Sequence, residues 1–184
     1  MTQAATFIDT VSGQTFPLSE PMWHAPNGNS LMISDLPGIS RTEIDFSNRS
    51  IWRYAKSLPV QILNPISLGE GRTPLISSEI DGLNFQFKLE WFSPTGSFKD
   101  RGASVLMSFL KQQGINIVVE DSSGNAGAAI AAYGAAAGMD VTILVPSYTQ
   151  PAKIVQSRAF GAEVILVPGE REDTAAAAIQ MAEK

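Results

Sequence analysis

Apolar and polar residues follow two different periods along the chain from residue 84 onward. Residues 84–90 alternate apolar and polar side chains with a period of two, which predicts a strand. Short apolar runs rich in β-branched residues predict further strands at 115–119, 141–145 and 164–167. Helical spacing and terminal glycines predict helices between them, at 98–113, 126–137 and 151–160. Because such strands alternate with helices, we expect an α/β fold in which helices cover both faces of a parallel sheet.

The first 66 residues lack this regularity, because prolines and glycines interrupt short apolar stretches. Asn27 and Gly28 predict a two-residue hairpin turn, and one helix is predicted at 47–58. The large aromatic side chains of this part have no evident core of their own; they are Trp23, Trp52 and Tyr54. We therefore interpret residues 1–66 as an extension that packs against a main domain of residues 67–184.

The end of the sequence predicts an unfinished βα unit. Glu172, Asp173 and Thr174 favour the start of a helix, but no glycine, proline or strand follows before Lys184. We therefore expect residues 67–184 to form the first portion of a larger domain.

Composition narrows the classes of function. The chain has 13 Lys and Arg against 18 Asp and Glu, a net charge of −5, which argues against nucleic acid and anionic membrane surfaces as partners. It has no cysteine and one histidine, so we expect no metal site and no cysteine nucleophile. The apolar run at 126–139 is shorter than the roughly 20 residues that span a bilayer. Because the first residues carry no export signal, we expect a cytoplasmic protein.

Two loops combine residues suited to chemistry, and each lies between a predicted strand and the start of a predicted helix. They are residues 93–102 and residues 121–127. In an open parallel sheet, the carboxyl ends of the strands and the helix N-termini meet at one edge, where ligands bind. We therefore expect both loops to face one crevice.

Lys99 is the candidate nucleophile of the first loop. It stands in the first helical turn, where a cation is unfavourable, and we expect Pro94 and Phe98 to limit the access of water. Both effects would lower the pKa of the amine, which suits a lysine that attacks a carbonyl to form a Schiff base. By position alone, an ordinary surface lysine is the commoner interpretation.

The second loop is the candidate anion site. Ser122, Ser123, Gly124 and Asn125 offer hydroxyls, an amide and successive backbone N–H groups, a nest suited to a carboxylate or a phosphate. The alternative is an ordinary turn in which the serines cap their own helix. The sequence has neither a dinucleotide fingerprint nor a Walker A motif, so NAD and ATP are disfavoured as ligands.

Taken with their spacing, these loops resemble the signature series of the fold-type II pyridoxal-phosphate enzymes, the tryptophan synthase β-like superfamily. The motifs are Gly71-Arg-Thr-Pro-Leu75, Lys88-Leu-Glu90, Pro94-Thr-Gly-Ser-Phe-Lys-Asp-Arg-Gly102 and Ser122-Ser-Gly-Asn-Ala-Gly127. Within that superfamily, residues 50–54, 68–71 and 98–102 are most similar to the threonine synthases. The resemblance is specific because several spaced motifs agree, and it covers residues 50–184.

The resemblance implies a role for each residue of the two loops. Lys99 would form the Schiff base with pyridoxal phosphate, Asn125 would hydrogen-bond the phenolic oxygen of that cofactor, and Phe98 would pack beside it. The α-carboxylate of the substrate would be bound by residues of the second loop, namely Ser122, Ser123, Gly124 and Ala126. Asp100 and Arg101 would form local ion pairs that hold the turn of Lys99 in place.

The resemblance also implies a reaction, in which a lyase of amino-acid biosynthesis converts O-phospho-L-homoserine and water to L-threonine and phosphate. A homo-oligomer is one assembly that it would allow. The alternatives are a serine or threonine dehydratase or a cysteine synthase-like enzyme of the same cofactor class, and a catalytically silent α/β module that binds a small anion or a partner chain.

Two parts of the family's cofactor site lie later in its chains than Lys184. They are a glycine-rich loop that grips the cofactor phosphate and a hydroxyl that faces the pyridine nitrogen. The resemblance therefore implies that residues 1–184 alone are inactive or bind the cofactor weakly.

Overall fold

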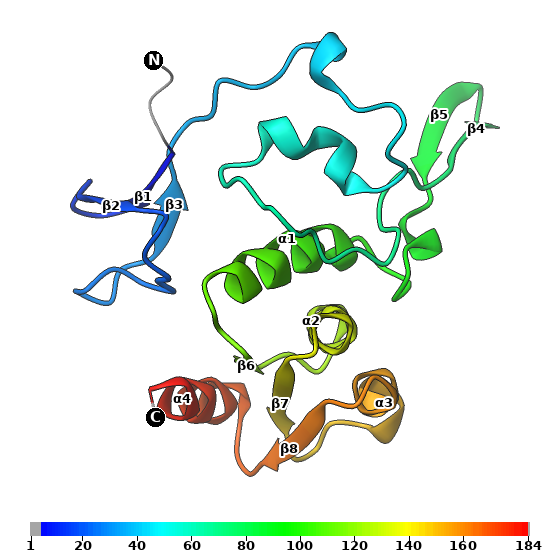
Figure 1. The fold of residues 1–184 in the computed structure, drawn as a ribbon. Coiled ribbons are helices and arrows are strands. Elements are labelled where there is room, and N and C mark those ends of the chain that lie inside the picture. The colour runs from blue at the N-terminus through cyan, green and yellow to red at the C-terminus, as the bar shows by residue number, and fades with distance from the viewer. Residues whose placement is uncertain (1–4, 184) are drawn as a thin grey trace.

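The computed structural model describes residues 5–183, and its centre is a three-stranded parallel sheet with the order β6-β7-β8 (Figure 1). The strands are β6 (Ile117–Glu120), β7 (Asp140–Pro146) and β8 (Glu163–Val167). Val118 pairs with Val141, and Ile143 pairs with Val164, so the three apolar runs lie side by side. The prediction of a parallel α/β sheet is confirmed, and each strand begins within two residues of its expected start.

Helices lie on both sides of this sheet. They are α1 (Lys99–Gln112), α2 (Asn125–Ala137), α3 (Pro151–Ala159) and α4 (Arg171–Ala182). Figure 1 shows α2 and α3 on one side of the sheet and α4 on the other, with α1 stacked against α2. One-sided placement of α2 and α3 follows from right-handed crossovers that step in one direction along the sheet. The predicted coverage of both faces is confirmed.

Small residues let α2 pack closely on the sheet. A Cβ atom at Gly134 would lie 2.2 Å from Cγ2 of Val141, so only glycine permits this separation of helix and strand. The alanines at 128, 129, 131 and 132 are buried on the same helix, and Tyr133 is fully buried. The apolar run at 126–139 is therefore a core helix. Among the described residues, no helix is long and apolar enough to cross a membrane.

The predicted strand at 84–90 does not join the parallel sheet. It is β5 (Leu83–Lys88), which pairs antiparallel with β4 (Leu75–Ile80) in a separate hairpin. Asp81 and Gly82 have φ angles of 52° and 76°, as the tight turn between the strands requires. β4 was not predicted, because its sequence lacks the alternation of β5 and only the Asp-Gly turn signal points to it.

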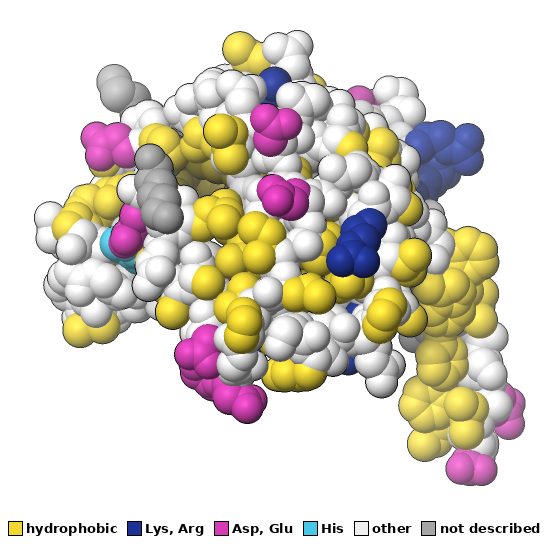
Figure 2. Space-filling model, turned by 90° about the horizontal axis from the view of Figure 1, so that it is seen from below, with side chains coloured by type: hydrophobic (Ala, Val, Ile, Leu, Met, Phe, Trp, Pro, Cys, Tyr) yellow, Lys and Arg dark blue, Asp and Glu magenta, His cyan; other side chains and the backbone are white. Residues whose placement is uncertain are grey.

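This hairpin presents an uncovered apolar face. The register places one set of side chains on the same face, and each of them is exposed: Ile76, Ile80, Leu83, Phe85 and Phe87. Figure 2 shows the hairpin projecting from the rest of the molecule, with hydrophobic side chains along it.

The helix predicted at 47–58 is wrong in type and in its start. The structure has a 3₁₀ helix, η2 (Ile51–Ser57), in which Tyr54 departs from helical geometry. The side chain of Asn48 accepts the backbone N–H of Ser50 at 2.9 Å, and that local turn keeps residues 48–50 out of the helix. Two shorter 3₁₀ helices are η1 (Arg41–Glu43) and η3 (Glu90–Phe92).

The start of the extension forms a small antiparallel sheet with the order β2-β1-β3. Its strands are β1 (Thr6–Asp9), β2 (Thr15–Pro17) and β3 (Leu31–Ile33). Asn27 and Gly28 do lie in a turn, which the Ala25 N–H to Asn29 carbonyl bond closes at 2.9 Å. This turn is not a hairpin between paired strands, because β2 and β3 both pair with β1.

A buried polar cluster joins the later part of the extension to the helices. Trp52 is 5% exposed, and its indole N–H donates to Oγ of Ser104 on α1 at 2.8 Å. Ser104 in turn lies 2.9 Å from Oε1 of Glu70, which is fully buried. Trp23 and Tyr54 are exposed, so Trp52 is the one of the three aromatic residues that packs as expected. The division at residue 66 stays a prediction.

Candidate functional site

Three helices begin at the edge of the sheet where its strands end. β6 ends at Glu120, β7 at Pro146 and β8 at Val167, and the loops that follow lead into α2, α3 and α4. α1 begins at this edge too, because the residues before it reach α3: the side-chain amide of Gln156 donates to the carbonyl of Thr95 at 3.0 Å. Ligands bind at this edge in open parallel sheets.

The loop before α1 places Lys99 as the first residue of the helix. Gly96, with a φ angle of 83°, makes the turn, and its N–H donates to the carbonyl of Ser93 at 2.8 Å. The N–H of Lys99 donates to Oγ of Ser97 at 3.3 Å, and its Nζ lies 5.0 Å from the centre of the Phe98 ring.

The expected shielding of Lys99 from water is wrong for the described residues. The side chains of Lys99 and Phe98 are both exposed, as is Pro94. Phe98 lies beside the amine but is itself exposed, so it does not cover the amine. The amine is therefore accessible to a ligand from solvent.

Asp100 was expected to form an ion pair, and the structure shows a different role. Its carboxylate is fully buried and accepts the backbone N–H of Thr95 at 2.7 Å and the hydroxyl of the same residue. Burial raises the pKa of Asp100, and the two hydrogen bonds from Thr95 oppose that rise. Arg101 does form the expected ion pair, with Glu90 at 2.9 Å.

The second loop ends at an uncapped helix. No side chain caps the start of α2, where Gly124 is the N-cap residue, so among the described residues the N–H groups of the first turn are free to bind a ligand. A Cβ atom at Gly127 would lie 2.2 Å from the carbonyl oxygen of Ser122, so glycine lets the loop fold back over the helix. A Cβ atom at Gly124 would meet nothing within 4 Å, which leaves room for a ligand.

The residues of this loop differ in their exposure. Ser122, Ser123 and Ala126 are half-buried, and Gly124 and Asn125 are exposed. Oγ of Ser122 accepts the N–H of Gly124 at 3.3 Å, a bond within the loop, whereas the alternative interpretation predicted that the serines cap the helix itself. The serine therefore supports the loop, and the helix behind it stays uncapped.

Electrostatics links the two loops. Burial and the neighbouring Asp121 raise the pKa of Glu120, and the positive charges of Arg171 and Lys99 oppose that rise. Glu120 is the last residue of β6, directly before the second loop. That the two loops face one crevice stays a prediction.

A cleft of about 350 Å³ at the same edge involves residues that the sequence analysis did not select. Ser123 lines it together with Tyr148, Thr149, Gln150, Lys153 and Arg171. Arg171 also forms an ion pair with Asp121 at 2.6 Å, which joins α4 to the second loop. Except for Ser123, these lining residues lie in the segments that follow β7 and β8, and this position in the sequence is the signal that could have predicted them.

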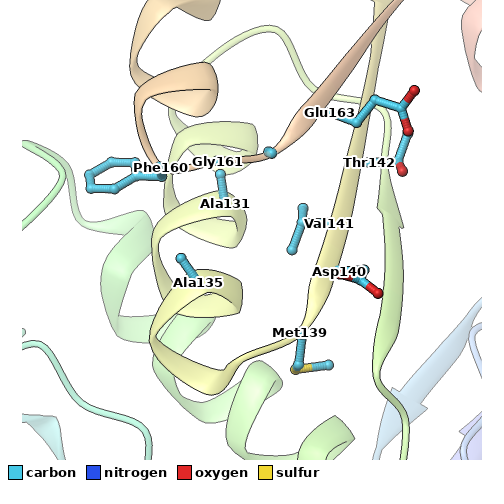
Figure 3. Close-up of a pocket in the computed structure, with 10 residues that line it drawn as sticks. Ala131, Ala135, Met139, Asp140, Val141, Thr142, Phe160, Gly161 and Glu163 are labelled. Atoms are coloured by element: carbon cyan, nitrogen blue, oxygen red, sulfur yellow. The ribbon is translucent and has the colours of Figure 1, made fainter.

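The cavity drawn in Figure 3 lies at the opposite edge of the sheet. It has a volume of about 250 Å³ and is lined by Met139 and Asp140 at the start of β7 and by Gly161 and Glu163 at the start of β8. No residue of the two loops lines it. The cavity is therefore separate from the candidate site.

The family of the protein follows from comparison with known sequences. Residues 66–184 match the model of the family described as "Pyridoxal-phosphate dependent enzyme". The chain belongs to this family, whose cofactor is pyridoxal phosphate.

Two relatives are threonine synthases from archaea. The threonine synthase of Methanosarcina acetivorans is 39% identical over 133 residues, which cover 69% of this chain and 33% of that protein. The threonine synthase of Methanocaldococcus jannaschii is 34% identical over 173 residues, which cover 88% of this chain and 43% of that protein. The chain therefore spans less than half the length of these relatives.

Solved structures show the same fold. A hydrogen sulfide-producing enzyme from Fusobacterium nucleatum aligns with a TM-score of 0.57 at 29% identity, covering 61% of this chain and 40% of that one. A serine racemase from maize aligns with a TM-score of 0.57 at 32% identity, covering 61% of this chain and 36% of that one. The fold-type II class expected from the motifs is thus confirmed.

The residues at the site fit the family's cofactor in kind. Lys99 is an exposed primary amine at a helix start, and the exposed amide of Asn125 opens the neighbouring helix. The open space at Gly124 and the uncapped N–H groups of α2 adjoin Asn125. Such a set can bind an aldehyde, a polar ring oxygen and a carboxylate. The specific role of each residue stays a prediction.

Proposed function

We propose that this chain carries the reactive lysine and the substrate-carboxylate loop of a threonine synthase, which converts O-phospho-L-homoserine and water to L-threonine and phosphate. One observation carries the proposal. In a chain of which 133 residues align at 39% identity with a threonine synthase, Lys99 opens a helix at the same sheet edge where α2 begins without a side-chain cap.

The start of α2 holds the substrate. Its free N–H groups and partial positive charge attract the α-carboxylate, and the hydroxyls of Ser122 and Ser123 lie in the loop that leads into it. Substrates without the α-carboxylate would therefore bind poorly.

Asn125 and Lys99 act on the cofactor and on the substrate. When bound, pyridoxal phosphate supplies an electron sink that stabilises negative charge on carbon atoms of the amino acid. Asn125 would donate a hydrogen bond to the phenolic oxygen of the ring and so keep the ring oriented. Lys99 would take the proton from the α-carbon and return protons to the neighbouring carbons, since its amine is tethered beside them.

Two other members of the class are the main competitors. Structures of a cysteine synthase from Entamoeba histolytica and of a serine racemase from maize align with TM-scores of 0.56 and 0.57. These proteins act on other amino acids by their printed names, so the fold alone does not select the substrate. The motifs at 50–54 and 98–102, together with the threonine synthase relatives, favour phosphohomoserine.

Two assays on the protein supplied with pyridoxal phosphate distinguish a threonine synthase from a serine or threonine dehydratase, the alternative of the same cofactor class that the sequence left open. Because residues 1–184 alone are expected to be inactive or to bind the cofactor weakly, we expect at most weak phosphate release from O-phospho-L-homoserine. Lys99→Ala should abolish this release and the visible absorption of the bound cofactor, whereas Lys111→Ala, which changes a lysine at the far end of the same helix, should leave both unchanged. Formation of a keto acid from serine or threonine without phosphate release would instead support a dehydratase. If neither reaction occurs and no visible absorption depends on Lys99, the chain is a silent binding module.

A further inference from the structure

Thr95 has three polar groups, its backbone N–H, its backbone carbonyl and its hydroxyl, and each forms a hydrogen bond with a side chain of α1 or α3. Asp100 on α1 accepts its N–H and its hydroxyl, and Gln156 on α3 donates to its carbonyl at 3.0 Å. Thr95 is 7% exposed and Asp100 is fully buried. We call these three residues the lysine-loop clamp.

The clamp contains a buried carboxylate, that of Asp100, whose burial is energetically unfavourable. A buried carboxylate loses the solvation that water provides, and among the described residues Asp100 has no cationic partner. The negative charge of Glu70 raises the pKa of Asp100 further. A neutral residue at position 100 would avoid this cost, so the carboxylate is explained by what it holds, which is Thr95.

The clamp lies directly before the candidate nucleophile. Three residues separate Thr95 from Lys99, and they include Gly96, whose φ angle of 83° lets the chain reverse. The direction of this turn depends on where Thr95 is held, because the helix that starts at Lys99 is itself packed on α2. A shift of Thr95 would therefore change the position of the amine relative to the start of α2.

Gln156 adds a connection that the local sequence does not contain. It belongs to α3, which follows the loop that lines the cleft beside Ser123. Through Gln156, α3 forms one hydrogen bond with the first loop, residues 93–102, which we call the lysine loop. The position of the amine thus depends on α3, a helix that begins 52 residues after the start of α1.

We propose that the lysine-loop clamp of Asp100, Thr95 and Gln156 positions the Lys99 amine for reaction with the cofactor and couples that position to α3. These are positioning residues that act through the loop. The proposal rests on the proposed function, because it takes Lys99 as the residue that reacts with pyridoxal phosphate.

The test measures the reactivity of individual lysines in the whole 184-residue chain. The protein is treated with pyridoxal phosphate and borohydride, and labelling of each lysine is quantified by mass spectrometry. Lys111 is the reference within each sample, because it is exposed at the other end of α1. Hydrogen exchange of the amides at 95–99 is measured on the same proteins without cofactor.

Three variants and two controls test the clamp. Thr95→Val removes the hydroxyl, Thr95→Ser keeps it, and Gln156→Ala removes the bond to α3. Gln86→Ala changes an exposed glutamine of the hairpin, and Asp140→Asn changes an exposed carboxylate at the opposite sheet edge. We expect the ratio of Lys99 to Lys111 labelling to fall at least threefold in Thr95→Val and Gln156→Ala, with faster exchange at 95–99. Thr95→Ser and both controls should stay within twofold of the wild type.

The outcomes separate this inference from the proposed function. Preferential labelling of Lys99 that is unchanged in folded Thr95→Val and Gln156→Ala overturns the clamp and leaves the cofactor role intact. A loss in Thr95→Ser equal to that in Thr95→Val also overturns it, because the hydroxyl would not matter. If wild-type Lys99 is labelled no faster than Lys111, the cofactor role is wrong, and unchanged exchange at 95–99 then overturns the clamp itself.

Discussion

Tyr133 of α2 donates its phenolic O–H to Oε2 of Glu70 across 2.7 Å, and both side chains are fully buried. Glu70 also accepts the backbone N–H of Leu68 at 3.0 Å and the hydroxyl of Ser67. Among the described residues it pairs with no cation, so hydrogen-bond donors alone compensate its charge. Burial and the negative charge of Glu70 raise the pKa of Tyr133, which therefore stays protonated as the donor.

Removal of this donor should destabilise the fold. Tyr133→Phe leaves one carboxylate oxygen of Glu70 with fewer partners in a buried site, which costs about 1–3 kcal/mol. Urea denaturation followed by circular dichroism measures the free energy of unfolding. Tyr148→Phe is the matched control, because Tyr148 is 65% exposed, and it should change that free energy by less than about 0.5 kcal/mol. Equal effects of both changes would contradict the role of the buried bond.

Close packing of α2 predicts opposite effects for two glycine substitutions. Gly134→Ala places a methyl group against Val141 and should cost about 1–3 kcal/mol, since the helix or the strand must shift. Gly102→Ala, in α1, meets nothing within 4 Å and should stabilise by up to about 1 kcal/mol through helix propensity. The same denaturation experiment compares them, and a stable Gly134→Ala would show that the packing is looser than described.

Asp9 should make the small sheet of the extension sensitive to acid. The hydroxyl of Ser12 is the main cause that lowers the pKa of Asp9, followed by the N–H of Val11, and Asn27 adds to both. A lowered pKa in the folded state stabilises the fold above the unfolded pKa of about 3.9, and this stabilisation is lost as pH falls below that value.

The variant Asp9→Asn isolates this contribution. The difference in unfolding free energy between the wild type and Asp9→Asn should be largest near neutral pH and should shrink progressively below about pH 5. Denaturation curves at several pH values measure it. A difference that is constant with pH would show that the Asp9 carboxylate is not stabilised in the folded state.

Asn125 gives a prediction for the cofactor itself. If it donates to the phenolic oxygen of pyridoxal phosphate, Asn125→Ala should weaken cofactor binding by about tenfold, the equivalent of a hydrogen bond worth about 1.4 kcal/mol. Titration of visible absorption gives the dissociation constant. Asn116→Ala, which changes an exposed residue before β6, is the control. Equal affinity in the wild type and in Asn125→Ala would remove Asn125 from the cofactor site.

Most elements of the main domain could be predicted because their signals are local. The runs at 141–145 and 164–167 are strands because β-branched residues suit a buried sheet, and Gly138 ends α2 because its φ angle of 61° is open to glycine. The hairpin partner β4 was missed because its sequence does not alternate. The helix at 47–58 was mistaken because the side chain of Asn48 makes a local turn with Ser50, and Ser50 then caps a shorter 3₁₀ helix that begins at Ile51.

The sequence by itself determined the class of the protein and the two loops, because residue type and spacing are enough to mark Lys99 and residues 122–126. Only the tertiary structure decided what surrounds them. In the folded protein, Asp100 forms hydrogen bonds with the buried Thr95 instead of an ion pair, and Lys99 is exposed. Gln156 forms a hydrogen bond with Thr95, 61 residues earlier in the chain. The physical reason is that hydrogen-bond partners and exposure depend on which helices pack together, and packing joins residues whose separation in sequence carries no signal.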